Sequence, residues 1–142
     1  MTFFRRSLAA LLVIATAFAA SVFAQSSTAK PTSKGSDPIV QDRPLSAWIA
    51  DLSADAPYTR TAAAYAVGSA GAAGKPAVPA LIANLSSESG PVRYSSVLAL
   101  GEIGPAAAEA VPALEKALDD RNDDVAAMAK KSLKKITGEA VE

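Results

Sequence analysis

From residue 45 onward, apolar residues recur with the spacing i, i+3, i+4 and i+7, and the arrangement returns every 33 residues. This spacing places the apolar side chains on one face of an α-helix. The three sets are Leu45, Trp48, Ile49 and Leu52, then Val78, Leu81, Ile82 and Leu85, then Val111, Leu114, Glu115 and Leu118. The pattern therefore predicts one amphipathic helix at the start of each of three repeated units.

A second helix is predicted in each unit. Its start is marked by Pro57, by Pro91 and by the acidic, helix-capping run at 122–124. Gly71 and Gly104 fall where a left-handed residue closes a helix. The units are predicted at about 44–71, 76–104 and 107–137, and no segment shows strand alternation. The expected fold class is all-α, an α-α superhelix (solenoid) of three stacked helix pairs with a 33-residue period.

The first two units also match residue by residue. Between 59–85 and 92–118, 11 of 27 positions are identical. Four of these are Ala and carry little weight in an Ala-rich chain, but Arg60 recurs as Arg93 and Pro79 recurs as Pro112. The repetition thus extends beyond apolar spacing to individual residues.

The segment 92–120, VRYSSVLALGEIGPAAAEAVPALEKALDD, resembles the short bacterial HEAT-like repeat of the phycobilisome-lyase type. Units of that family read roughly V-R-x-x-A-A-x-A-L-G-x-I-G, followed by A-V-P-x-L-x-x-x-L. The resemblance covers about 95 residues, 44–138, and implies a helical solenoid. The third unit departs from the pattern, with Ala126 at the Arg position and Lys134 at the first Gly. One uniform ligand-binding row across all three units is therefore not expected.

Several residues are assigned structural roles. The resemblance implies that Arg60 and Arg93 bond carboxylates and carbonyls of the neighbouring turn. We predict a salt bridge from Arg93 to a carboxylate of the next unit. The candidate carboxylates are Asp119, Asp120, Asp123 and Asp124. The remaining assignments, for helix packing, helix ends and repeat positions, are Trp48, Gly68, Gly71, Pro79, Gly101, Gly104 and Pro112.

The first 24 residues have the pattern of a secretory signal peptide, with Arg5 and Arg6 before an apolar run and a small-x-small site at 22–24. Cleavage after Ala24 would give an exported protein, periplasmic or secreted, with no membrane span after cleavage. The alternative is an uncleaved anchor, but the uncharged run at 7–24 has 18 residues against roughly 20 for a span. Residues 25–43 are predicted to be a flexible polar linker, in which only the apolar pair at 39–40 can pack onto the first helix.

Composition excludes most familiar catalytic chemistry. The chain has no Cys and no His, so it lacks thiol nucleophiles, zinc-thiolate sites and the commonest general base. Its 14 basic and 14 acidic residues balance, which gives no reason to expect nucleic acid. We therefore predict no catalytic residue, no cofactor, no metal and no nucleic-acid partner.

Three short motifs allow chemical alternatives. An S-x-x-K motif at 132–135 matches a serine acyl-enzyme motif, but its partner motifs are missing. A D-x-N-x-D motif at 120–124 resembles the start of a calcium loop, but Val125 stands where Gly is needed, which favours a helix cap. The lysine-rich run at 130–135 is interpreted as a solvated end face rather than a basic binding patch.

The variable positions of the second helices are expected to face outward on the concave side of the solenoid. They are Thr61, Ala62, Tyr65, Ser69, Tyr94, Ser95, Leu98, Glu102, Ala127, Met128, Lys131 and Lys135. We predict a protein-binding surface in which Tyr65, Tyr94 and Leu98 form an apolar cluster edged by Glu102 and Lys131. The alternative is that these side chains fill grooves between units as part of the core.

The sequence favours a non-enzymatic protein-binding scaffold or adaptor in the cell envelope, with a protein partner that the sequence does not identify. The resemblance implies an alternative, a bilin lyase-like enzyme or chromophore-attachment accessory. An exported chain fits poorly with pigment attachment inside the cell, and the residues specify no pigment pocket.

Overall fold

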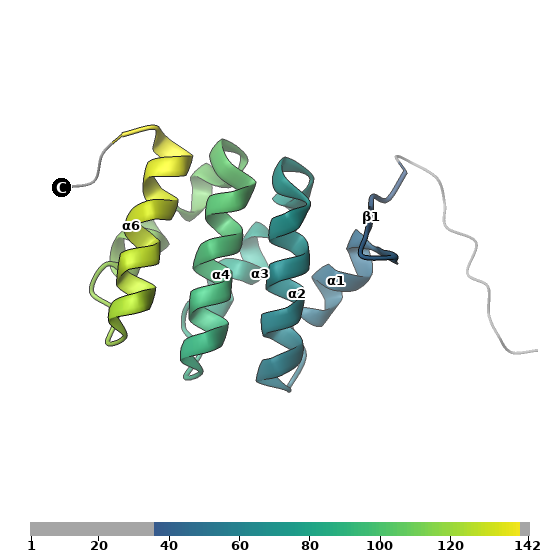
Figure 1. The fold of residues 1–142 in the computed structure, drawn as a ribbon, viewed down its shortest axis with the longest axis horizontal. Helices are drawn as coiled ribbons and strands as arrows, with labels where there is room; N and C mark the ends of the chain where they lie inside the picture. Colours follow the sequence, from purple (N-terminus) through teal and green to yellow (C-terminus); the bar gives the residue numbers. More distant parts are fainter. Residues whose placement is uncertain (1–35, 140–142) are drawn as a thin grey trace, which may run out of the picture. The chain divides into compact units, whose positions relative to one another are not determined.

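The computed structural model describes residues 36–139, and the predicted signal peptide lies outside them. Three helix pairs are present in this part of the chain (Figure 1). The first helices of the pairs are α1 (Leu45–Asp51), α3 (Val78–Asn84) and α5 (Val111–Ala117). The second helices are α2 (Pro57–Ser69), α4 (Gly90–Ile103) and α6 (Asp123–Thr137). The all-α class and the three pairs are confirmed.

The second helices pack side by side, with α4 between α2 and α6 (Figure 1). Because α4 has a neighbour on each side, most of its residues are buried, including Val92, Val97 and Leu100. Each unit adds a buried Leu from its first helix, Leu81 from α3 and Leu114 from α5. The core therefore runs continuously through the three units.

Glycines allow the second helices to approach closely. A Cβ built on Gly68 of α2 would lie 3.1 Å from the Cα of Ala99 on α4. A Cβ on Gly101 of α4 would lie 3.0 Å from the Cα of Ser132 on α6. Both distances are too short for an ordinary side chain, so the predicted role of these glycines in close packing is confirmed.

The connections between units are helical, although the sequence predicted no helix between the units. Gly71 and Gly104 have positive φ values of 56° and 70°, a region that favours glycine. Gly104 has ψ −143°, so the left-handed helical conformation predicted there is not adopted. The chain then continues as the 3-10 helices η1 (Gly71–Ala77) and η2 (Gly104–Ala110). Both segments are partly buried, and buried backbone groups need hydrogen-bond partners, which the tight i to i+3 turns supply.

A small β-hairpin precedes α1, where the sequence predicted linker and no strand. It consists of β1 (Ile39–Val40) and β2 (Arg43–Pro44), which pair antiparallel. Gln41 and Asp42 between them have φ values of 49° and 60°, the conformation of a two-residue type I′ turn. The part of the linker prediction that covers 39–43 is therefore corrected.

Trp48 of α1 explains why the hairpin forms. Its indole Nε1 donates a hydrogen bond to the carbonyl oxygen of Val40 at 2.9 Å, and the guanidinium of Arg43 lies 4.1 Å from its ring centroid. Arg43 also pairs with Asp51 of α1 at 2.9 Å. In the repeat register Trp48 corresponds to the fully buried Leu81, and within residues 36–139 the hairpin lies against Trp48 where a helix pair would cover it in a later unit.

Within the described residues, one helical run, Gly90–Ala117, is long and apolar enough to cross a membrane by length and composition. Half of its most apolar window is buried inside the domain. The run is interrupted by the positive φ of Gly104 and comprises α4, η2 and α5. We therefore interpret it as the core of two repeat units.

Candidate functional site

Two adjoining grooves cross the surface formed by α2, α4 and α6, which we call the second-helix face. The α4–α6 groove has a volume of about 540 Å³, and the α2–α4 groove has a volume of about 350 Å³. The first is lined by residues that include Tyr65, Pro91, Tyr94, Asp124, Met128 and Lys131. The second is lined by residues that include Tyr65, Gly68, Ser69, Leu98 and Glu102. All five residues of the predicted protein-binding surface thus line one groove or both.

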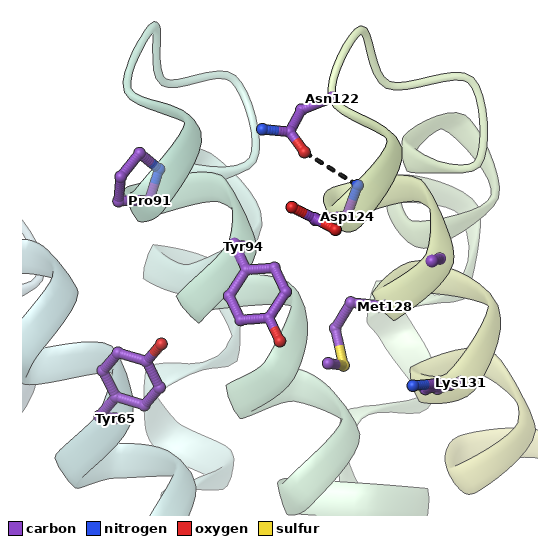
Figure 2. Close-up of a pocket in the computed structure, with 8 residues that line it drawn as sticks. Tyr65, Pro91, Tyr94, Asn122, Asp124, Met128 and Lys131 are labelled. Atoms are coloured by element: carbon purple, nitrogen blue, oxygen red, sulfur yellow. Dashed lines mark hydrogen bonds between the residues drawn. The ribbon is translucent and has the colours of Figure 1, made fainter.

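The apolar side chains of this surface differ in depth. Tyr65 is 47% exposed, whereas Tyr94 and Leu98 are half-buried and Tyr94 packs against the core. Figure 2 shows the Tyr94 ring between α4 and α6, with the side chain of Met128 beside it. The structure therefore combines the two interpretations of the sequence: Tyr94 and Leu98 partly fill the grooves, and Tyr65 stands at their border.

Ser95 is an exception to the predicted outward positions. It is fully buried, and its hydroxyl donates to the carbonyl oxygen of Val92 at 3.1 Å. The register partners of Ser95 in the outer helices, Ala62 and Met128, are partly exposed. Because α4 is flanked on both sides, its exposed stripe is narrower than those of α2 and α6, and the uniform outward pattern was wrong at Ser95.

Charged groups border the grooves. Lys135 pairs with Glu102 at 2.5 Å, and both side chains are about half exposed. Lys131 is exposed and forms no ion pair with any residue that the structure describes. Asp124 lies in the first turn of α6, likewise exposed. The rim is therefore polar, as predicted. Glu102 and Lys135 pair with each other, whereas Asp124 and Lys131 form no ion pair with the residues that the structure describes.

The predicted inter-repeat salt bridge is confirmed. Arg93 donates from Nε and Nη2 to the two carboxylate oxygens of Asp120, at 2.8 and 2.9 Å, and from Nη1 to the carbonyl oxygens of Ser87 and Glu88. The side chains of Arg93 and Asp120 are only 6% and 10% exposed. The hydrogen bonds from Arg93, opposed by burial, hold the pKa of Asp120 below its ordinary value, and the pair raises the pKa of Arg93.

Arg60, the register partner of Arg93, lacks this arrangement. The residue that corresponds to Asp120 one unit earlier is Ser87, so no carboxylate is supplied at that position. The buried Nε of Arg60 has no hydrogen-bond partner among residues 36–139. The expectation that Arg60 binds a neighbouring carboxylate is therefore wrong, and the cause is the Ser for Asp difference between units.

The chemical motifs serve structural roles. The Asn122 side chain accepts hydrogen bonds from the backbone N–H groups of Asp124 and Val125. It therefore caps α6, which is the interpretation that the sequence favoured over a calcium loop. Within the described part of the chain, no cluster of three or more potential metal-ligating side chains is found. Ser132 is buried and donates to the carbonyl oxygen of Val97 at 2.8 Å, which joins α6 to α4.

Sequence reasoning left Pro91 and Asp124 out of the site because both were assigned to helix starts. They occupy the same register position as Tyr58, which is 84% exposed at the start of α2. Tyr58, Pro91 and Asp124 each lie one helical turn before an outward position of the second helices, so the same repeat register would have placed all three on the second-helix face. Met128 was among the outward positions, but its spacing alone did not show that it meets Tyr94.

The fold and the grooved face define a helical-repeat protein with a surface suited to binding. A family model described as HEAT repeats matches residues 45–134, more than half of the chain. The chain therefore belongs to the HEAT-repeat family. No curated protein matches it. HEAT repeats commonly act as protein-interaction scaffolds.

Proposed function

We propose that this protein is a non-enzymatic scaffold or adaptor that binds a protein partner through its second-helix face in the cell envelope. One observation carries the proposal: Tyr65, Tyr94, Leu98, Glu102 and Lys131, chosen for exposure by repeat register, line two adjoining grooves. Grooves of this size fall in the range of ligand sites. Tyr side chains inside a polar rim are typical of interaction hot spots.

Export is the second part of the proposal and is supported by the N-terminal sequence pattern. If the leader is removed as proposed, N-terminal sequencing of the protein from its native host begins at Gln25. Recovery of the full chain in washed membranes would contradict removal and favour a retained anchor.

The binding surface is tested with the double variant Tyr65→Ala, Tyr94→Ala. We expect the wild-type chain to capture a partner from the envelope fraction of its native host, and the double variant to lose it. Lys116→Ala is the control, because Lys116 is exposed on α5, outside the second-helix face, and lines neither groove.

Two outcomes would contradict the proposal. Capture by the double variant at the wild-type level, with a melting temperature lowered by several degrees, would assign both tyrosines to the core. Visible absorbance of the protein purified from its native host would instead indicate a bound chromophore.

A further inference from the structure

Opposite charges stand at the two ends of the α4–α6 groove. Asp124 and Lys131 both project from α6 toward the groove, and the Tyr94 ring lies between their levels (Figure 2). They are seven residues apart on one helix, which is about two turns, or roughly 10 Å along the axis. The groove therefore has a negative end, an apolar centre and a positive end.

Neither charge forms an ion pair with a residue that the structure describes. The cap of α6 is the side chain of Asn122, so the carboxylate of Asp124 is not needed for capping. Lys135, one turn beyond Lys131, is neutralised by Glu102, whereas Lys131 forms no ion pair with the residues described. The two groups are thus available to a ligand.

The groove is narrow because α4 and α6 are in close contact beneath it. A Cβ built at position 101 would lie 3.0 Å from the Cα of Ser132, so the backbones of the two helices are in close contact at this point. An α-helix with its side chains is about 10–12 Å wide, so it would lie over this groove rather than within it. A segment in the extended polyproline II conformation has three residues per turn and advances about 3.1 Å per residue, so side chains three residues apart point to the same side and lie roughly 9 Å apart, close to the separation of the two charges.

We propose that the α4–α6 groove binds an extended segment of a protein partner that carries a basic and an acidic side chain three residues apart, with apolar residues between them. The basic group pairs with Asp124, the acidic group pairs with Lys131, and an apolar side chain packs between Tyr94 and Met128. Either chain direction satisfies this pattern. This inference rests on the proposed function and specifies the chemistry of the partner segment.

The test uses two blocked peptides, acetyl-Lys-Leu-Phe-Glu-amide and acetyl-Lys-Leu-Phe-Gln-amide, titrated into the full chain to millimolar concentration and followed by NMR. We expect the Glu peptide to bind about threefold more tightly, because a partly exposed ion pair contributes modestly. Lys131→Gln should remove this preference. Lys130→Gln, on the same helix but outside the groove, should keep it.

The Asp124 end of the groove is tested with a third peptide, acetyl-Gln-Leu-Phe-Glu-amide, which is compared with acetyl-Lys-Leu-Phe-Glu-amide. Asp124→Asn should abolish the preference for Lys over Gln, and Asp123→Asn is the matched control in the same helical turn. Equal binding of all three peptides to the wild-type chain, or the absence of saturable binding, would overturn the inference.

Failure of the inference is distinguishable from failure of the proposed function. If partner capture is lost in the Tyr65→Ala, Tyr94→Ala variant but is unchanged in Lys131→Gln and Asp124→Asn, the second-helix face binds the partner and the charge pattern is wrong. If the tyrosine variant also captures the partner normally, the proposed function fails as well.

Discussion

At the residue scale, the pair of Arg93 and Asp120 is the strongest polar link between units. It joins α4 to the turn before α6 with two charge-assisted hydrogen bonds, and its side chains are almost fully buried. We expect Asp120→Asn to lower the free energy of unfolding by about 2 kcal/mol, or the melting temperature by about 10 °C. Thermal and urea unfolding measure this change. Asp119→Asn, exposed and adjacent, is the control.

The same pair predicts a pH dependence. Because Arg93 lowers the pKa of Asp120 in the folded state from 3.8, the pair stabilises fully above that unfolded-state value. Its contribution is lost as pH falls through the lowered folded-state pKa. The stability difference between wild type and Asp120→Asn should therefore be constant at neutral pH and shrink below about pH 4. A difference that grows on acidification would contradict this assignment.

Ser87 offers a way to complete the second pair. The Ser87 hydroxyl accepts from the backbone N–H of Ser89, just as Asp120 accepts from that of Asn122, so the two side chains occupy equivalent turns. Ser87→Asp should place a carboxylate at Arg60 and stabilise the protein by about 1 kcal/mol. A double-mutant cycle with Arg60→Gln measures the coupling. The same gain in the presence and absence of Arg60 would refute the pairing.

At the element scale, the spacing of α4 and α6 depends on Gly101. A methyl group there would lie 2.5 Å from the Ser132 Oγ and 3.0 Å from its Cα, so the helices must move apart. We expect Gly101→Ala to cost about 2 kcal/mol in unfolding experiments. Gly90→Ala, in the first turn of α4, meets only the Asn122 side chain at 3.5 Å and should be neutral or stabilising. The reverse order of stability would disprove close helix packing at Gly101.

The helices were predictable from the sequence, and the hairpin was not. Each helix carries its own apolar spacing and end signals, and the 33-residue repetition tests each assignment three times. The hairpin has only two residues per strand and depends on Trp48, eight residues beyond Val40, for its stabilising contact. No local alternation can reveal an element whose stability comes from such a tertiary contact.

At the scale of the whole domain, the two ends of the repeat array differ from its middle. The hairpin covers the first unit at Trp48. At the other end, Lys134 occupies the register position of Gly68 and Gly101 and is exposed. A fourth unit would need a small residue there, so Lys134 opposes further stacking. The lysine-rich end of α6 is therefore explained as a solvated face of the last unit, as the sequence indicated.

The candidate site was predictable in part of its membership but not in depth. Register alone identified Tyr65, Tyr94, Leu98, Glu102 and Lys131, because 33-residue columns of a repeat array share one face. The grooves themselves depend on how closely neighbouring second helices pack. Contacts such as that of Gly101 with Ser132 set the distance between the helices. This distance determines how deeply each side chain is buried, so that Ser95 is fully buried and Tyr94 is half-buried. One-dimensional spacing contains no measure of this distance.

The central claim is that the second-helix face binds a protein partner, and hydrogen–deuterium exchange of the full chain with and without the captured partner tests it most directly. We expect slower exchange in α2, α4 and α6 on the sides that carry Tyr65, Tyr94 and Lys131, with α1, α3 and α5 unchanged. Protection confined to α1, α3 and α5 would contradict binding at the second-helix face, because the partner would then bind the opposite side of the repeat array.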